Sequence, residues 1–134
     1  MTPPPLRTIM LIDDSDADNF FHALLLERSG LALHVMVFEW AERALAWFSD
    51  HPHHDVDLVL LDINMPRMDG FEFLDRFHLL PDEQQGDARI CMLSSSPLDH
   101  ERERAIGYPR VADFIVKPLE DETLPQLRRL RTIR

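Results

Sequence analysis

The chain has 134 residues, 45% of them hydrophobic, and its 24 acidic and 14 basic side chains give it a formal charge of −10. This length predicts one domain, and the acidic balance excludes duplex nucleic acid as an expected direct partner, because such binding needs clustered Lys and Arg. No apolar run approaches the roughly 18 residues of a membrane span, the N-terminus does not resemble a signal peptide, and the single cysteine fits a reducing compartment. We therefore expect a cytoplasmic protein with no membrane insertion.

The chain begins with a proline-rich segment, residues 1–5, which we expect to be a disordered tail before a domain of residues 6–134. The apolar run Ile9–Ile12 follows. About four apolar residues between turn signals are typical of a strand buried on both faces of a parallel sheet. This run therefore predicts the first strand.

A helix is predicted over Asp16–Ser29, because the segment begins with capping residues and stops at Gly30. His22 on this helix is expected at the surface or partly buried. The apolar side chains expected on one face of the helix are Phe20, Phe21, Leu24 and Leu25. Phe20, Phe21 and the later Trp40 are expected in the core.

The same alternation continues through the middle of the chain. Apolar runs at Leu33–Phe38 and Leu58–Leu61 predict strands, with a helix over Ala41–Asp50 between them. A further helix is predicted over Phe71–Leu80. It should end before Pro81, and residues 81–88 indicate an exposed loop.

The last third contains weaker patterns. A strand is predicted at Ile90–Leu93, a thinly apolar helix over Pro97–Gly107 and a fifth strand at Phe114–Val116. The last helix should run from about Glu122 toward Thr132, with Pro125 in or near its first turn. Five strands alternating with five helices predict an α/β fold built on a parallel sheet.

Polar side chains follow four of the five predicted strands. They are Asp13 and Asp14, then Asp62, then Ser94, and finally Lys117, which is the only lysine of the chain. The carboxyl ends of parallel strands share one edge of a sheet, so these side chains should lie together. Clustered carboxylates stay ionised beside a cation, and Mg²⁺ suits oxygen ligands. The set predicts phosphoryl transfer in which a carboxylate oxygen attacks.

Four segments resemble the signature segments of response-regulator receiver domains: MLIDDSDADNF, LVLLDINMPRMDG, CMLSSS and DFIVKP. The resemblance covers roughly residues 6–133. It implies a flavodoxin-like, doubly wound, five-stranded parallel sheet of order 2-1-3-4-5 with five helices. It further implies a stand-alone, chemotaxis-type regulator of a two-component system.

The resemblance assigns the metal site and the phosphorylated residue. Asp62 would accept a phosphoryl group from a sensor histidine kinase or a histidine phosphotransfer protein. Mg²⁺, for which Mn²⁺ can substitute, would be held by Asp13, Asp14, Asp62 and the backbone carbonyl of Asn64.

The resemblance also assigns the residues that transmit the signal. Ser94 and Lys117 would bind the phosphoryl group, and Phe114 would be the aromatic switch that turns inward with Ser94. Pro118 matches the Lys-Pro bond of the family, which is often cis. Ser96 would influence the lifetime of the phosphoryl group, as would the residue two positions after the acceptor.

The expected output is binding to a downstream protein effector through the surface of the fourth helix, the fifth strand and the last helix, with a homodimer as a further outcome. The domain would phosphorylate and dephosphorylate itself and would not be a metabolic enzyme. Two alternatives stay open. One is a phosphorylation-independent docking module, and the other is an aspartate-nucleophile phosphohydrolase. Such hydrolases normally carry a second acid two residues after the nucleophile, where this chain has Asn64.

Overall fold

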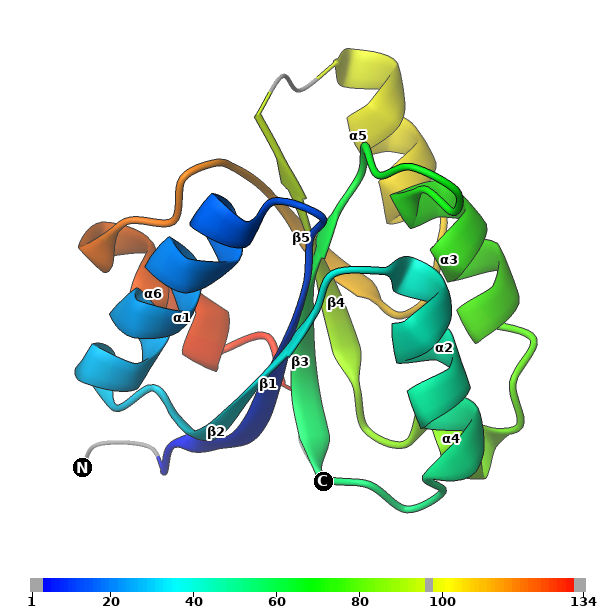
Figure 1. The fold of residues 1–134 in the computed structure, drawn as a ribbon, viewed down its shortest axis with the longest axis horizontal. Coiled ribbons are helices and arrows are strands. Elements are labelled where there is room, and N and C mark those ends of the chain that lie inside the picture. Colours follow the sequence, from blue (N-terminus) through cyan, green and yellow to red (C-terminus); the bar gives the residue numbers. More distant parts are fainter. Residues whose placement is uncertain (1–3, 96–97, 132–134) are drawn as a thin grey trace.

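A five-stranded parallel sheet organises the chain (Figure 1). The computed structural model describes residues 4–95 and 98–131. The strands are β1 (Leu6–Ile12), β2 (Ala32–Phe38), β3 (Val56–Asp62), β4 (Arg89–Ser94) and β5 (Val111–Val116). Their order, β2-β1-β3-β4-β5, confirms the predicted flavodoxin-like topology.

Helices cover both faces of this sheet (Figure 1). One face carries α1 (Asp16–Ser29) and α6 (Leu124–Arg128), and the other carries α2 (Ala41–Asp50), α3 (Gly70–Phe77), α4 (Asp82–Gln85) and α5 (Asp99–Ile106). The predicted fourth and last helices correspond to α5 and α6. A 3-10 turn, η1 (Asp121–Thr123), leads into α6, which has Pro125 in its first turn as expected. Within the described ranges, no helix is long and apolar enough to cross a bilayer.

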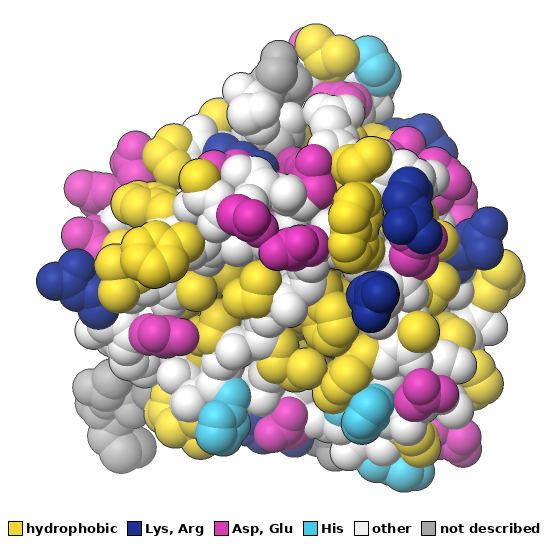
Figure 2. Space-filling view, viewed as in Figure 1, with side chains coloured by type: hydrophobic (Ala, Val, Ile, Leu, Met, Phe, Trp, Pro, Cys, Tyr) yellow, Lys and Arg dark blue, Asp and Glu magenta, His cyan; other side chains and the backbone are white. Residues whose placement is uncertain are grey.

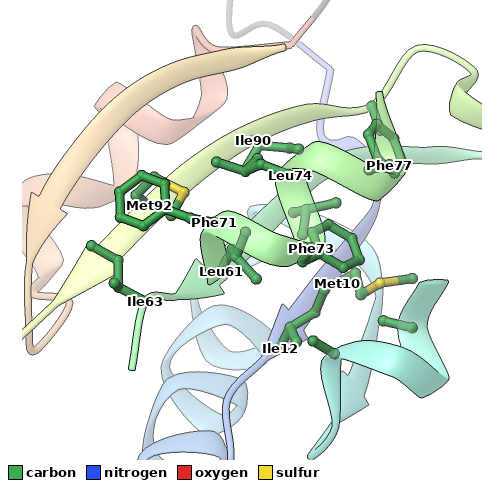
Figure 3. Packing of buried hydrophobic residues seen from close by; sticks show 14 of the residues in the cluster. Met10, Ile12, Leu61, Ile63, Phe71, Phe73, Leu74, Phe77, Ile90 and Met92 are labelled. Atoms are coloured by element: carbon green, nitrogen blue, oxygen red, sulfur yellow. The ribbon is translucent and has the colours of Figure 1, made fainter. Parts of the chain in front are cut away.

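The core lies on both sides of the sheet and fixes the strand ends. All residues of β3 are buried. Against α2 and α3, the rings of Phe48 and Phe77 meet edge to face at 5.0 Å. Figure 3 shows Leu61 and Ile63 packed beside Phe71, at the end of β3. Because such interiors are close-packed, the carboxyl end of β3 is held firmly.

Helix α1 has the predicted bounds, but the face predicted to be buried is exposed to solvent. Its exposed apolar side chains are Phe20, Phe21 and Leu24, with exposed fractions of 72%, 47% and 40%. Asn19 and His22 are buried instead. The expectation that Phe20 and Phe21 belong to the core is therefore wrong, and Trp40 is only half-buried. The polar residues turn inward because they have hydrogen-bond partners there, at the edge of the sheet described below.

The loop predicted over residues 81–88 contains a short helix, α4. The buried Gln85 side chain donates to the carbonyl oxygen of Leu80 at 2.8 Å. Arg110 donates to Gln85 Oε1 at 3.1 Å and to the carbonyl oxygen of Gly86 at 2.8 Å. A partner so far along the chain leaves no local signal. The described residues therefore contain six α-helices rather than the five predicted.

The amino ends of the strands are held by arginines. Arg7 donates from its backbone N–H and its guanidinium to Asp57, at 2.8 and 2.7 Å. Burial alone would raise the pKa of Asp57, but the bonds from Arg7 outweigh it and hold the pKa below its usual value. Near the other end of the chain, Arg131 donates to the carbonyl oxygens of Pro4 and Pro5 at 3.2 and 3.1 Å. Of the predicted tail, residues 4 and 5 are described and make these bonds, whereas residues 1–3 lie outside the described part, so their disorder stays a prediction.

Candidate functional site

Four adjacent strands end at one edge of the sheet. β1, β3, β4 and β5 are consecutive in the sheet, and they end at Ile12, Asp62, Ser94 and Val116. Asp13 and Lys117 come directly after two of these ends. The structure therefore brings the predicted residues to a single edge, as the parallel topology requires.

Three carboxylates form a cluster at this edge. Asp13, Asp14 and Asp62 each offer an oxygen, and these atoms lie within 4.8 Å of one another. Asp13 and Asp62 are buried, whereas Asp14 is exposed. Asp13 is oriented by the backbone N–H of Ser15, which donates to its Oδ1 at 3.0 Å. An all-oxygen donor set open to solvent on one side fits Mg²⁺, which retains several waters.

Lys117 lies among these acids. Its Nζ is 2.6 Å from Asp13 Oδ2, 2.9 Å from Asp18 Oδ2 and 3.2 Å from Asp62 Oδ1. Burial lowers the pKa of Lys117, but its hydrogen bonds to Asp13 and Asp18 and the charge of Asp62 outweigh burial and raise the pKa above its usual value. The backbone N–H of Lys117 also donates to the carbonyl oxygen of Ser94 at 2.9 Å. The ammonium is therefore charged and fixed beside Asp62.

Asp62 is electrostatically strained without a cation. Burial, followed by the negative charge of Asp13, raises the pKa of Asp62 to about 6, although Lys117 opposes the rise. A carboxylate that loses water and gains a like charge is less stable ionised. A divalent cation at the cluster would reverse that balance.

Helix α1 supplies contacts that the sequence analysis missed. Asn19 Nδ2 donates to the backbone oxygen of Asp13 at 2.7 Å, and Asp18 binds Lys117. His22 Nε2 accepts the backbone N–H of Leu119 at 3.2 Å, and burial lowers the pKa of His22, which suits a neutral acceptor. These three residues fall on one face of the helix by the i, i+1, i+4 spacing. This polar spacing is visible in the sequence, but the partners of Asp18 and His22 lie about 100 residues further along the chain and leave no local signal.

The loop after Asp62 is tightly constrained. The N–H of Gly70 donates to the carbonyl oxygen of Ile63 at 2.8 Å. A Cβ on Gly70 would lie 2.6 Å from the carbonyl oxygen of Asp62, so only glycine fits this approach. Asn64 is exposed in this loop, and Arg67 ties the loop to α2 through Glu42, with Nε 2.8 Å from Oε1.

The remaining predicted residues lie around this edge. Phe114 is buried in β5, and the guanidinium of Arg102 from α5 lies 4.9 Å from its ring centroid. The Lys117–Pro118 peptide bond is cis, as the family pattern suggests. Ser94 is buried at the end of β4. Ser96 lies outside the described residues, so its role stays a prediction.

The surface around the site is divided by chemistry. Figure 2 shows acidic side chains gathered between apolar groups, one of which covers the region of α1. The acidic rim extends to Glu39, whose pKa is raised by its hydrogen bond with Asp16 and by the charge of that residue. The site therefore lies in an acidic part of the surface, beside exposed apolar side chains.

Comparison with known proteins gives one consistent family. A family model described as "Response regulator receiver domain" matches residues 9–129. The chain is 30% identical over 120 residues to the signal transduction histidine-protein kinase BarA of Escherichia coli. The aligned region covers 90% of this chain but only 12% of BarA. The match therefore concerns a small part of that relative.

The chain is also similar to solved structures of response regulators. A response regulator receiver protein from Dyadobacter fermentans is 32% identical, with a TM-score of 0.77 over 92% of this chain and 94% of that one. The chemotaxis protein CheY4 of Vibrio cholerae is 25% identical, with a TM-score of 0.76 over 93% and 98% of the two chains.

Proposed function

The chain belongs to the response regulator receiver domain family, and from that membership we propose that it is a chemotaxis-type, phosphorylation-dependent signalling switch. One observation carries the proposal. A buried carboxylate, Asp62, lies beside a charged lysine and within 4.8 Å of two further carboxylates. Those are the groups that phosphoryl transfer to an aspartate requires.

In the proposed reaction, an Asp62 oxygen attacks the phosphorus of a phosphohistidine on a kinase or phosphotransfer protein. The P–O bond forms as the P–N bond breaks, and the electron pair of that bond stays on the imidazole nitrogen. Lys117 Nζ donates to the transferred group, and the Ser94 hydroxyl binds a phosphoryl oxygen. Later attack by water on phosphorus returns the carboxylate and releases inorganic phosphate.

Asp13, Asp14, Asp62 and the backbone carbonyl of Asn64 would hold Mg²⁺, with Mn²⁺ as a substitute. Bound there, the ion supplies positive charge that offsets the phosphoryl oxygens. The carboxylate cluster supports this assignment, because its acids repel one another without a cation.

We propose that the signal leaves through α5, β5 and α6 by altered binding of a downstream protein, or of a second copy. Phe114 supports this route, because its ring joins β5 to α5 through Arg102.

Lys117→Ala should retain Mg²⁺ binding but uncouple phosphorylation from the change of shape. Retained coupling in that variant would count against the role of Lys117.

Incubation with acetyl phosphate and Mg²⁺ tests the proposal by intact mass. A labile adduct of about +80 Da on the wild type, absent from Asp62→Asn, supports the switch; this is the mass of one phosphoryl group. Steady multiple-turnover hydrolysis would indicate the phosphohydrolase instead. Absence of any adduct would indicate the docking module.

A further inference from the structure

We propose that Asp18 is a positioning residue for phosphoryl transfer, which holds Lys117 in place while Asp13 and Asp62 serve the metal and the phosphorus. The inference rests on the proposed function. It adds a member to the site that the acidic cluster does not contain, because Asp18 is not among the three clustered carboxylates.

The contacts of the ammonium group lead to this assignment. A lysine Nζ has three N–H donors, and Lys117 has three carboxylates around it, at 2.6 Å (Asp13), 2.9 Å (Asp18) and 3.2 Å (Asp62). The Asp13 and Asp18 contacts are hydrogen bonds with good donor geometry. Two donors are thus held from the β1–α1 side, which leaves the third directed at Asp62.

The two other carboxylates have competing tasks during the reaction. Asp13 would ligate the cation, and Asp62 would become an acyl phosphate, so each offers Lys117 less negative charge. Asp18 has neither task. It is therefore the one acid of the three that can pair with Lys117 throughout the cycle.

The chain fixes Asp18 where this role needs it. Its backbone N–H donates to the Ser15 side chain at 3.2 Å, which caps α1. One turn later, His22 accepts the N–H of Leu119, two residues after Lys117. Helix α1 therefore holds the loop that carries the lysine at two points, through side chains four residues apart on one face.

The matched control is Asp16, which lies in the same first turn of α1 and is exposed. Asp18→Asn and Asp16→Asn remove the same charge from the same helix end, so their effects on the helix dipole are alike. Of these two residues, only Asp18 contacts Lys117. The partner of Asp16 is Glu39 rather than Lys117, so a difference between the two variants in the signal of Lys117 reports the Asp18 contact.

The first measurement uses the fact that Lys117 is the only lysine. Lysine labelled with ¹³C at Cε gives one side-chain NMR signal. We expect Asp18→Asn to move this signal, both in the metal-free protein and after treatment with acetyl phosphate and Mg²⁺, and Asp16→Asn to leave it in place. A signal that does not move in Asp18→Asn, or that moves equally in Asp16→Asn, would overturn the proposal.

The second measurement is the initial rate of adduct formation with acetyl phosphate and saturating Mg²⁺. We expect Asp18→Asn to lower this rate roughly tenfold through misplacement of the ammonium, and Asp16→Asn to change it by less than about twofold. In a Lys117→Ala background, Asp18→Asn should have no further effect. An undiminished rate in Asp18→Asn, or an equal loss in both backgrounds, would contradict the assignment. A wild type that forms no adduct would instead refute the proposed function itself.

Discussion

Replacing the proposed phosphoacceptor should make the metal-free protein more stable. Burial and the charge of Asp13 raise the pKa of Asp62 to about 6, from a usual value of 3.8. The folded state therefore holds a proton that the unfolded chain releases between these two values. The free energy of unfolding therefore falls as the pH rises through that window, and the full loss is present above about pH 6.

The size of the penalty follows from the shift. A difference of about 2 pKa units corresponds to about 3 kcal/mol. Asp62→Asn keeps the shape of the side chain and removes the charge, so it should recover up to about this amount at pH 8. For a chain of this length, that is a rise in Tm on the order of 10 °C.

Urea unfolding with EDTA, at pH 4 and at pH 8, measures the effect. We expect Asp62→Asn to exceed the wild type at pH 8 and to match it more closely at pH 4. Added Mg²⁺ should narrow the gap at pH 8, because the ion stabilises the ionised carboxylates. A variant less stable than the wild type at pH 8 in EDTA, or a gap independent of pH, would refute the electrostatic reasoning.

Three further substitutions test other parts of the structure. Asp57→Asn should destabilise the protein at neutral pH by about 1–3 kcal/mol, because it breaks the charged bonds from Arg7; since the pKa of Asp57 is depressed, the loss in urea unfolding should shrink as the pH falls through that pKa. Phe114→Ala should leave adduct formation nearly intact but weaken binding of the phosphorylated form to its downstream partner. Equal affinities of the wild type and the variant for that partner would rule out a switch role for Phe114. Gly70→Ala should lower both stability and Mg²⁺ affinity, because its Cβ would meet the carbonyl oxygen of Asp62 at 2.6 Å. A calorimetric titration that gives an unchanged Mg²⁺ affinity would contradict the expected effect of this contact on the metal site.

The strands and the bounds of α1 and α2 could be predicted because their signals are local, whereas α3 ends at Phe77 rather than Leu80 and α6 ends at Arg128 rather than near Thr132. The capping of α1 by Ser15 and its end at Gly30, with φ of 70°, are consequences of nearby residues. The predicted fifth strand began too late, because β5 starts at Val111 and includes the polar Asp113. An apolar run cannot mark a strand residue of that kind.

The site residues at the strand ends could be predicted from the sequence, but the residues of α1 that support them could not. Asp13, Asp62 and Lys117 follow apolar runs, and parallel topology brings such positions together. Asp18 and His22 lie inside a helix whose apolar residues suggested the opposite buried face. Polar side chains are buried where partners satisfy them, and those partners come from about 100 residues further along the chain.

The link between Arg131 and the carbonyls of Pro4 and Pro5 has a practical consequence. It brings the two ends of the described chain to the margin of the sheet where β1 begins, across the molecule from Asp62. A sensor chip, a dye or a fused protein attached at either end would therefore leave the reacting margin facing the solvent.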